Sequence, residues 1–227
     1  MYFNMTHEFV LIRHGETDWN QQRILQGHAN ISLNENGRIQ SVNLGRLMRQ
    51  LFSHPKNLQI QSSDLLRAQQ TCELMLDNWF HKAPPPPVSL SRDLREVFLG
   101  QAEGQSRDEI PRLFGEENWQ RWLSREEKDL SYGFPEGESR RQALERFSKH
   151  VFKAIEKQSP ELTVIITHGL IMRTFTQFYH PEQEMDFLIP NCSILRFQMR
   201  TDPKLNTSRP VLTSRHTLDS DLNAARG

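Results

Sequence analysis

Five residues that could together carry out phosphoryl transfer follow short apolar segments of this chain. They are Arg13, His14, Arg67, Glu96 and His168. A guanidinium suits bidentate contact with phosphate oxygens, and an imidazole attacks phosphorus when the attacking nitrogen carries no proton. A carboxyl group can protonate a departing alkoxide and then activate water. Gathered in one pocket, these groups would transfer a phosphoryl group through a covalent phosphohistidine.

The elements that must position these groups are predicted from the apolar pattern of the chain. Strands are expected at 9–12, 58–60, 88–90, 162–166 and 193–197, and helices at 34–52, 64–80, 138–157 and 170–178. Ser32 and Glu35 have the spacing of a capping box near the start of the first helix. This alternation predicts an α/β fold, a three-layer α/β/α sandwich with a mostly parallel central sheet. The carboxyl ends of its strands would bring the five groups to one edge.

Two further segments stand outside this alternation. Residues 106–135 are richer in charge and aromatics, which predicts a helical cap insertion. Its Trp119 and Trp122 are interpreted as a packing face, with stacking against a substrate as the alternative. Residues 1–200 are interpreted as a single catalytic domain, and the polar residues 201–227, which show no sustained period, as a loose C-terminal tail.

The composition excludes several classes of function. Among 227 residues, 28 Lys and Arg balance 28 Asp and Glu, which removes the electrostatic case for binding nucleic acid or an anionic membrane. The chain has no apolar stretch near the roughly 18 residues that a membrane span needs. Residues 1–7 lack a secretory pattern, and Cys72 and Cys192 form no CxxC pair. We therefore expect a cytoplasmic protein whose partner is a small phosphorylated substrate, and the sequence does not indicate an oligomeric state.

Seven groups of residues resemble, in order, the motifs of the histidine phosphatase superfamily, which includes the cofactor-dependent phosphoglycerate mutases. They are 11–17 with Trp19 and Asn20; Gly27 with 33–37; Ser62 and Ser63 with Arg67, Ala68 and Thr71; Leu94, Glu96, Gly100, Glu103 and Gly104; 135–139; 167–169; and 191–193. The resemblance spans roughly residues 8–198.

The resemblance implies a role for each of these site residues. His14 would be the nucleophile that accepts the phosphoryl group, and Glu96 the proton donor, with nearby Glu103 as the alternative carboxyl. Phosphate would be held by Arg13, Asn20, Arg67, His168 and Gly169. The resemblance implies no metal and no cofactor, and the metal motif HExxH is absent from the sequence. The seven other histidines, His28 among them, are interpreted as surface residues.

Two departures from the mutases favour a phosphatase. Mutases of this family have a Tyr three positions after the acid, where this chain has Leu99. Their adjacent arginine pair belongs to the inserted region, whereas Arg140 and Arg141 follow the Pro-Glu-Gly-Glu-Ser motif here. Mutase-type transfer and a non-catalytic phosphate-binding protein on the same fold are the alternatives. The sequence does not indicate which phosphomonoester is the physiological substrate.

Overall fold

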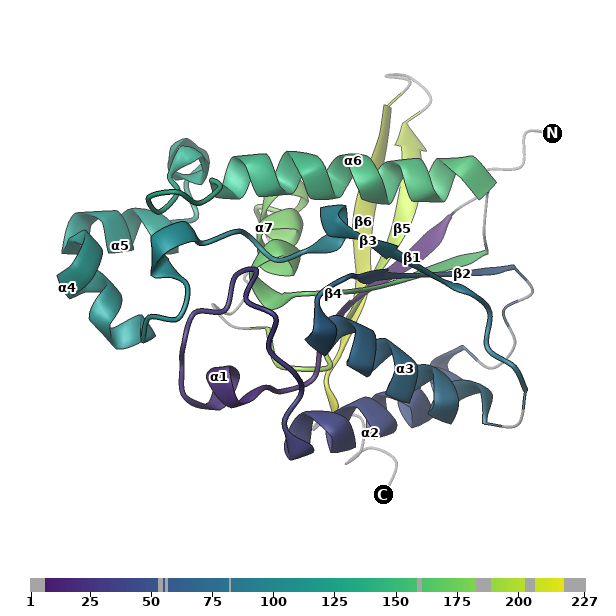
Figure 1. Cartoon of the computed structure of the whole chain (residues 1–227). Helices are drawn as coiled ribbons and strands as arrows, with labels where there is room; N and C mark the ends of the chain where they lie inside the picture. The colour runs from purple at the N-terminus through teal and green to yellow at the C-terminus, as the bar shows by residue number, and fades with distance from the viewer. Residues whose placement is uncertain are drawn as a thin grey trace.

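A six-stranded mixed sheet forms the centre of the molecule (Figure 1). This computed structural model describes residues 7–52, 55, 57–81, 83–158, 161–182, 189–202 and 207–218. The strands are β1 (Glu8–Arg13), β2 (Leu58–Ser63), β3 (Val88–Ser91), β4 (Leu162–Thr167), β5 (Ile194–Asp202) and β6 (Thr207–His216). They lie in the order β3-β2-β4-β1-β5-β6.

Four neighbouring strands of this sheet run parallel. β4 pairs with β1 on one side and with β2 on the other, and β2 pairs with β3. β5 and β6 are antiparallel to their neighbours. Thr167 lies opposite Arg13, so the chain leaves β1 and β4 at the same level. The predicted α/β fold with a mostly parallel sheet is confirmed.

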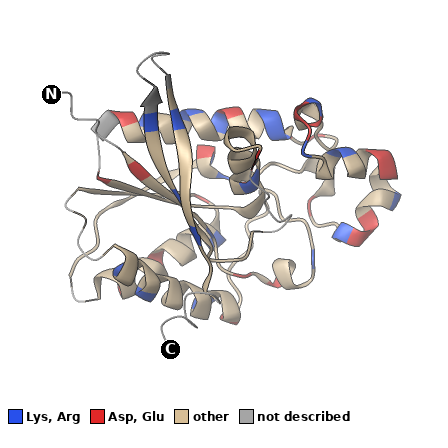
Figure 2. Cartoon of the chain, turned by 180° about the vertical axis from the view of Figure 1, so that it is seen from behind, with Lys and Arg blue, Asp and Glu red and all other residues tan. Residues whose placement is uncertain are grey.

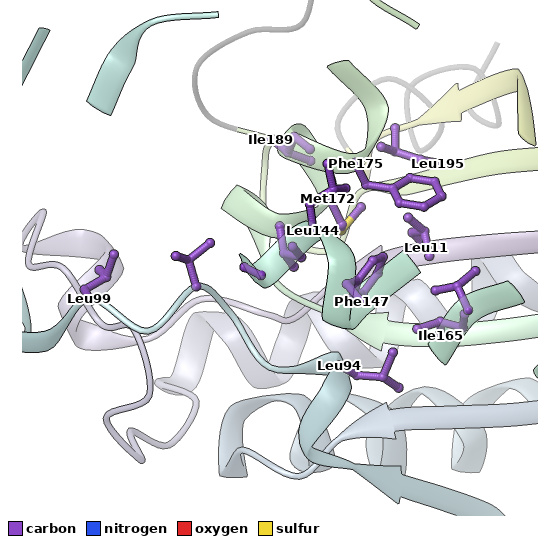
Figure 3. Packing of buried hydrophobic residues seen from close by; sticks show 14 of the residues in the cluster. Leu11, Leu94, Leu99, Leu144, Phe147, Ile165, Met172, Phe175, Ile189 and Leu195 are labelled. Atoms are coloured by element: carbon purple, nitrogen blue, oxygen red, sulfur yellow. The ribbon is translucent and has the colours of Figure 1, made fainter. Parts of the chain in front are cut away.

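Helices cover both faces of the sheet, giving the three predicted layers (Figure 1). One face carries α2 (Glu35–Leu51) and α3 (Leu66–Phe80), and the other carries α6 (Arg140–Gln158) and α7 (Gly169–Tyr179). Alternate side chains of β1 enter two separate cores: Val10 belongs to the core under α2 and α3, and Leu11 to the other. Figure 3 shows the second core, where Leu11 lies with residues such as Phe147 and Phe175.

The loop after β1 is fastened to the start of α2, although by a different cap from the one predicted. The N-cap is Asn34, whose side chain accepts a hydrogen bond from the Gly37 N–H at 2.8 Å. The capping box of Ser32 and Glu35 is therefore wrong, because the helix begins at Glu35 itself. Asn34 Nδ2 also donates to Glu16 Oε1 at 2.9 Å, which joins α2 to the loop that carries His14.

The insertion is helical, as predicted, and lies beside the sheet beyond the strand ends (Figure 1). It contains η3 (Arg107–Glu109), α4 (Ile110–Phe114), α5 (Glu116–Leu123) and η4 (Glu127–Ser131). Trp119 and Trp122 are both buried. Charged residues of both signs lie on these helices and on α6 (Figure 2). None of the helices in the described residues is long and apolar enough to cross a membrane.

The expectation of a loose tail after residue 200 is wrong for the described part of that segment. β5 continues to Asp202, and β6 returns antiparallel to it with Arg196 opposite Ser214 and Met199 opposite Pro210. β6 forms an edge of the sheet and is largely polar, so it lacks the apolar pattern of the inner strands. Proline is tolerated on an edge strand, because one side of such a strand needs no ladder hydrogen bond. The tail beyond Leu218 lies outside the described residues.

Replacing Gly37 with Ala should destabilise the protein. A Cβ on Gly37 would lie 2.7 Å from Glu16 N and closer still to Glu16 O, so the loop bearing His14 would have to move. We expect the free energy of unfolding to fall by about 1–3 kcal/mol, as for other overpacked sites, when it is measured by urea denaturation.

The matched control is Asn36→Ala, one residue earlier on the exposed side of α2. This change should alter stability by no more than about 0.5 kcal/mol. Equal stability of the two variants would show that the approach of α2 to this loop is not a constraint.

Candidate active site

The strand ends bring the two histidines and two arginines together. His14 directly follows β1 and His168 directly follows β4, and their ring centroids lie 5.1 Å apart. Arg67, in the first turn of α3, donates from Nε to Nε2 of His14 over 3.2 Å. Arg13, the last residue of β1, completes the group. The prediction that the ends of the parallel strands bring these side chains together is confirmed.

His14 is held as a neutral imidazole. Its Nδ1 lies 2.6 Å from the carbonyl oxygen of Gly15, which only accepts, so Nδ1 must carry the proton. The other ring nitrogen, Nε2, then has its lone pair available and accepts from Arg67. Burial, followed by the charges of Arg67 and Arg13, holds the pKa of His14 well below its usual value of 6.5. The ring therefore presents an unprotonated nitrogen next to a cation.

Arg67 is fixed by the backbone of a neighbouring loop. Its guanidinium donates to the carbonyl oxygens of Ala29 and Gly27, both at 2.8 Å. Burial lowers the pKa of Arg67 to about 10, so the side chain stays charged at neutral pH. Two carbonyl groups thus hold a buried cation against His14.

Arg13 lies between the end of β1 and the start of α7. Its Nη1 donates to the Ile189 carbonyl. Gly169 begins α7, and a Cβ at this position would lie 3.1 Å from Arg13 Nε. The absence of a side chain at Gly169 therefore allows the guanidinium to approach the N-terminus of α7. The first N–H groups of a helix have no partner within the helix itself, so such a terminus favours anions.

His168 is the one predicted site residue that does not line the cavity. It is fully buried, and its Nε2 lies 2.8 Å from Ser63 Oγ at the end of β2. Burial, then the charge of Arg67, holds the pKa of His168 well below 6.5. His168 therefore lies behind His14, and a serine of a third strand fixes one of its ring nitrogens.

Glu96 caps helix α7. Its carboxylate accepts hydrogen bonds from the N–H groups of Leu170 at 2.9 Å, Ile171 at 2.8 Å and Val97 at 3.0 Å. The predicted proton donor thus occupies the helix terminus that Arg13 also approaches. Its predicted alternative, Glu103, accepts from the backbone N–H of His28 at 2.5 Å instead.

The loop that carries Glu96 is clamped by α6. Arg146 donates to the carbonyl oxygens of Arg95 and Glu96, both at 3.1 Å, and forms an ion pair with Glu138. The interpretation of His28 as a surface residue is wrong, because it is half-buried and its Nε2 lies 2.8 Å from the Glu96 carbonyl oxygen. Sequence patterns gave no signal for this clamp, since its parts are distant in the chain.

Asn20 reaches the cavity from α1 (Asp18–Gln21). Its Oδ1 accepts from Thr17 N at 3.2 Å, which completes a capping box at the start of this short helix. Asn191 donates to the His14 carbonyl oxygen at 2.9 Å and lies 3.4 Å from Asn20 Oδ1. Because Oδ1 is used in this way, the amide NH₂ is the group that Asn20 can offer to a phosphate.

Thr71 of α3 fixes the loop that carries the nucleophile, a role that the sequence did not predict. It accepts from the Gly15 N–H at 2.9 Å and donates to the Arg67 carbonyl oxygen at 2.7 Å. Thr71 and Ser63 both belong to the matched motif, but only the coordinates assign their contacts.

The cavity has a volume of about 240 Å³ and lies between the strand ends and the cap. Of the predicted site residues, Arg13, His14, Asn20, Arg67, Glu96 and Gly169 line it. Trp119 and Trp122 also border it, so the face that packs under the cap is at the same time a wall of the cavity. Among the described residues, no three His, Cys, Asp or Glu side chains could hold a metal ion.

Two buried neutral histidines should make the protein less stable in mild acid. In the unfolded chain both rings bind protons below about pH 6.5, whereas the depressed pKa values of His14 and His168 keep them neutral in the folded state. The unfolded state then binds more protons, so the free energy of unfolding falls as the pH drops below 6.5. The expected slope is up to about 1.4 kcal/mol per pH unit for each ring.

Urea denaturation at pH 7.5, 6.5 and 5.5 measures this slope. His168→Gln should reduce the slope by the contribution of one imidazole, whatever the substitution does to the stability at neutral pH. Stability that stays level between pH 6.5 and 5.5 would contradict the neutral state of the two imidazoles.

Comparisons with known proteins agree on the family. Residues 9–207 match the family model of the histidine phosphatase superfamily (branch 1). Phosphoglycerate mutase-like protein 4 of Arabidopsis thaliana is 31% identical over 192 residues, which cover 85% of this chain and 79% of that protein. A broad-specificity phosphatase of Saccharomyces cerevisiae is 27% identical over 217 residues, covering 93% and 88% of the two chains.

The fold is also shared with solved structures. A mycobacterial glucosyl-3-phosphoglycerate phosphatase in complex with VO3 superposes with a TM-score of 0.71 at 22% identity, covering 91% of this chain and 98% of that one. At this identity the likeness concerns the fold alone. The extent of the family match and the identity to the plant relative confirm the predicted resemblance, and this chain belongs to the histidine phosphatase superfamily.

Proposed function

We propose that this protein is a metal-independent phosphomonoester hydrolase that acts through a covalent phosphohistidine on His14. The observation that carries the proposal is the state of the His14 ring: Nδ1 is committed to the Gly15 carbonyl, and the unprotonated Nε2 accepts a hydrogen bond from the buried Arg67 cation. A neutral imidazole beside a cation is suited to attack on an anionic phosphate. The family membership supports the same chemistry.

In the first proposed step, the hydrogen bond from Arg67 to His14 Nε2 breaks, and the Nε2 lone pair forms a bond to phosphorus while the bond from phosphorus to the ester oxygen breaks. Arg13, Arg67 and the start of α7 at Gly169 bind the phosphoryl oxygens, Asn20 donates from its amide, and His168 supports the charge that develops. The imidazolium keeps its Nδ1 proton on the Gly15 carbonyl. The departing alkoxide takes a proton from Glu96.

In the second proposed step, the Glu96 carboxylate removes a proton from water, and the resulting hydroxide attacks phosphorus. The bond between phosphorus and Nε2 breaks, which releases inorganic phosphate and restores the neutral His14. The proton taken from water leaves Glu96 ready for the next cycle. Atoms and charge balance over the two steps without a metal or a cofactor.

Glu96 occupies the N-terminus of α7, where the substrate phosphate is proposed to bind. Its carboxylate accepts from the N–H groups of Leu170 and Ile171, next to Gly169. A phosphate arriving at the N-terminus of α7 competes for these donors with a greater negative charge. We infer that substrate displaces Glu96 from the helix and frees it to hold and transfer a proton.

Hydrolysis is favoured over mutase-type transfer by the surroundings of the cavity. Leu99 lines the cavity where mutases place a Tyr. Arg140 donates to the carbonyl oxygens of Ser124 at 2.8 Å and Arg121 at 3.1 Å, and Arg141 pairs with Glu127, so both arginines hold the cap. We propose a small phosphorylated molecule as substrate.

Two buried free cysteines support a reducing compartment, the cytoplasm, for the protein.

His14→Ala should abolish turnover, because no other group would form the covalent intermediate. We expect phosphate release from p-nitrophenyl phosphate to fall at least about a thousandfold. Rapid acid quenching should trap acid-labile phosphate on the wild type and none on the variant.

His81→Ala, at the exposed end of α3, is the matched control and should keep full activity. Retained turnover in His14→Ala would place the nucleophile elsewhere. Isomerisation of a phosphorylated substrate without phosphate release would support a mutase, and phosphate binding without either reaction a binding protein.

Glu96→Gln should slow esters of poor leaving groups far more than activated aryl esters, since only the former need a proton. Reaction rates for a series of esters with leaving groups of increasing basicity give the dependence directly. We expect the rate to fall more steeply with increasing basicity of the leaving group for Glu96→Gln than for the wild type.

The comparison variant is Glu103→Gln, which changes the alternative carboxyl in the same way and should keep the wild-type dependence. A steep dependence in Glu103→Gln alone would assign the acid to that residue. An equal loss on all esters in Glu96→Gln would limit Glu96 to its role as a helix cap.

A further inference from the structure

Apolar side chains make up a large part of the cavity wall. Six of these are Trp19, Ile24, Leu25, Leu99, Trp119 and Trp122. They come from three separate regions: α1 with the segment that follows it, the loop after Glu96, and helix α5 of the cap. A substrate whose phosphate lies against His14 in this cavity would bring its alcohol portion against these side chains.

The cap part of the wall is held in place before any substrate arrives. Trp122 is only 2% exposed, and its ring lies 4.7 Å from that of Phe134 by their centroids. The Arg140 guanidinium lies 5.6 Å from the Trp122 ring, and that of Arg107 lies 5.6 Å from the Trp119 ring. A fixed aromatic surface of this kind binds flat apolar groups with little loss of conformational entropy.

The backbone along this wall offers few hydrogen bonds to a ligand, because its groups are paired within the protein. Leu25 N donates to the Gln105 carbonyl oxygen at 3.0 Å, and the Leu25 carbonyl accepts from Gly104 N at 2.9 Å. Ile24 pairs with Ser106 in an isolated antiparallel bridge. The segment therefore presents side-chain carbon to the cavity.

Polar residues also line the cavity. Asn20 and Asn191 lie by His14, and Gln26 precedes Gly27, whose carbonyl binds Arg67. Along the apolar wall the charged side chains are Arg23 and Arg107, which are cations and donate only. A hydroxyl oxygen could accept from these cations, but neither they nor the apolar side chains offer an acceptor, so the O–H groups of a sugar or polyol placed against this wall would stay unpaired, which costs binding energy.

We propose that the substrate is a small phosphomonoester whose alcohol portion is apolar, such as an aryl or arylalkyl group, and carries few or no hydroxyl groups. This inference rests on the proposed function, since it assumes that the ester is bound with its phosphate at His14. The cavity of about 240 Å³ lies below the range of roughly 300–1,000 Å³ that accommodates drug-sized ligands, which restricts the organic group to a small one.

Two esters that differ in polarity but have leaving groups of similar basicity test this inference. Benzyl phosphate and 2-hydroxyethyl phosphate both release a primary alkoxide, so a difference in kcat/KM reports on how the organic group is bound. We expect kcat/KM to be at least about tenfold higher for benzyl phosphate. An equal value, or a preference for the hydroxylated ester, would overturn the proposal.

A matched pair of variants locates the effect. Leu25→Ser places a hydroxyl group on the wall at a half-buried position, and Leu113→Ser makes the same change on α4, where the side chain is 42% exposed. Leu25→Ser should reduce the preference for benzyl phosphate at least about threefold, whereas Leu113→Ser should leave it unchanged. Equal effects of the two changes would show that this wall does not select the substrate.

Binding of non-hydrolysable analogues separates failure of this inference from failure of the proposed function. Calorimetry with the wild-type protein compares benzylphosphonate with 2-hydroxyethylphosphonate. Tighter binding of benzylphosphonate without turnover of either ester would support the apolar site and reject the phosphatase. Turnover of both esters with tighter binding of the hydroxylated analogue would support the phosphatase and reject the apolar site, and binding of neither analogue would also reject it.

Discussion

The contact between Arg67 Nε and His14 Nε2 is the constraint on which the rest of the site depends. A permanent cation lies 3.2 Å from a ring nitrogen in a buried position, so protonation of that nitrogen would place two positive charges side by side. The ring is therefore neutral. The same cation is held by the carbonyls of Gly27 and Ala29, so the nucleophile is ready only when β1, α3 and the intervening loop are all in place.

The parallel sheet provides this assembly through its register. Arg13 lies opposite Thr167, so the residues that follow, His14 and His168, leave neighbouring strands at one level. A shift of one residue would turn one of the two side chains to the other face of the sheet. β2 pairs with β4 on the side opposite β1. This places Ser63 against His168 and the start of α3 next to the imidazoles. Strand order and register thus determine which catalytic side chains meet, and the loops only refine their positions.

This dependence explains how far the sequence predicts the molecule. Apolar periods locate the inner strands and helices, and the rule that parallel strands end at one edge brings His14, His168, Arg13 and Arg67 together. The sequence did not predict β6, because an edge strand needs no apolar alternation. It also gave no indication that Glu96 caps α7 or that Arg146 clamps the Glu96 loop, since these bonds join residues 75 and 50 positions apart, respectively, through side-chain geometry.

The residues that bind phosphate and the residues of the apolar wall come from different parts of the chain, so the two can change independently. The phosphate end is made by strand ends and helix starts, whose positions the sheet fixes. The apolar wall is made largely by the cap and by the segment around Leu25, neither of which belongs to a strand of the sheet. Arg140 fastens the cap to the first turn of α6 without reaching the cavity itself. Substitutions in the wall can therefore alter the organic group that is accepted while the geometry at His14 stays as it is.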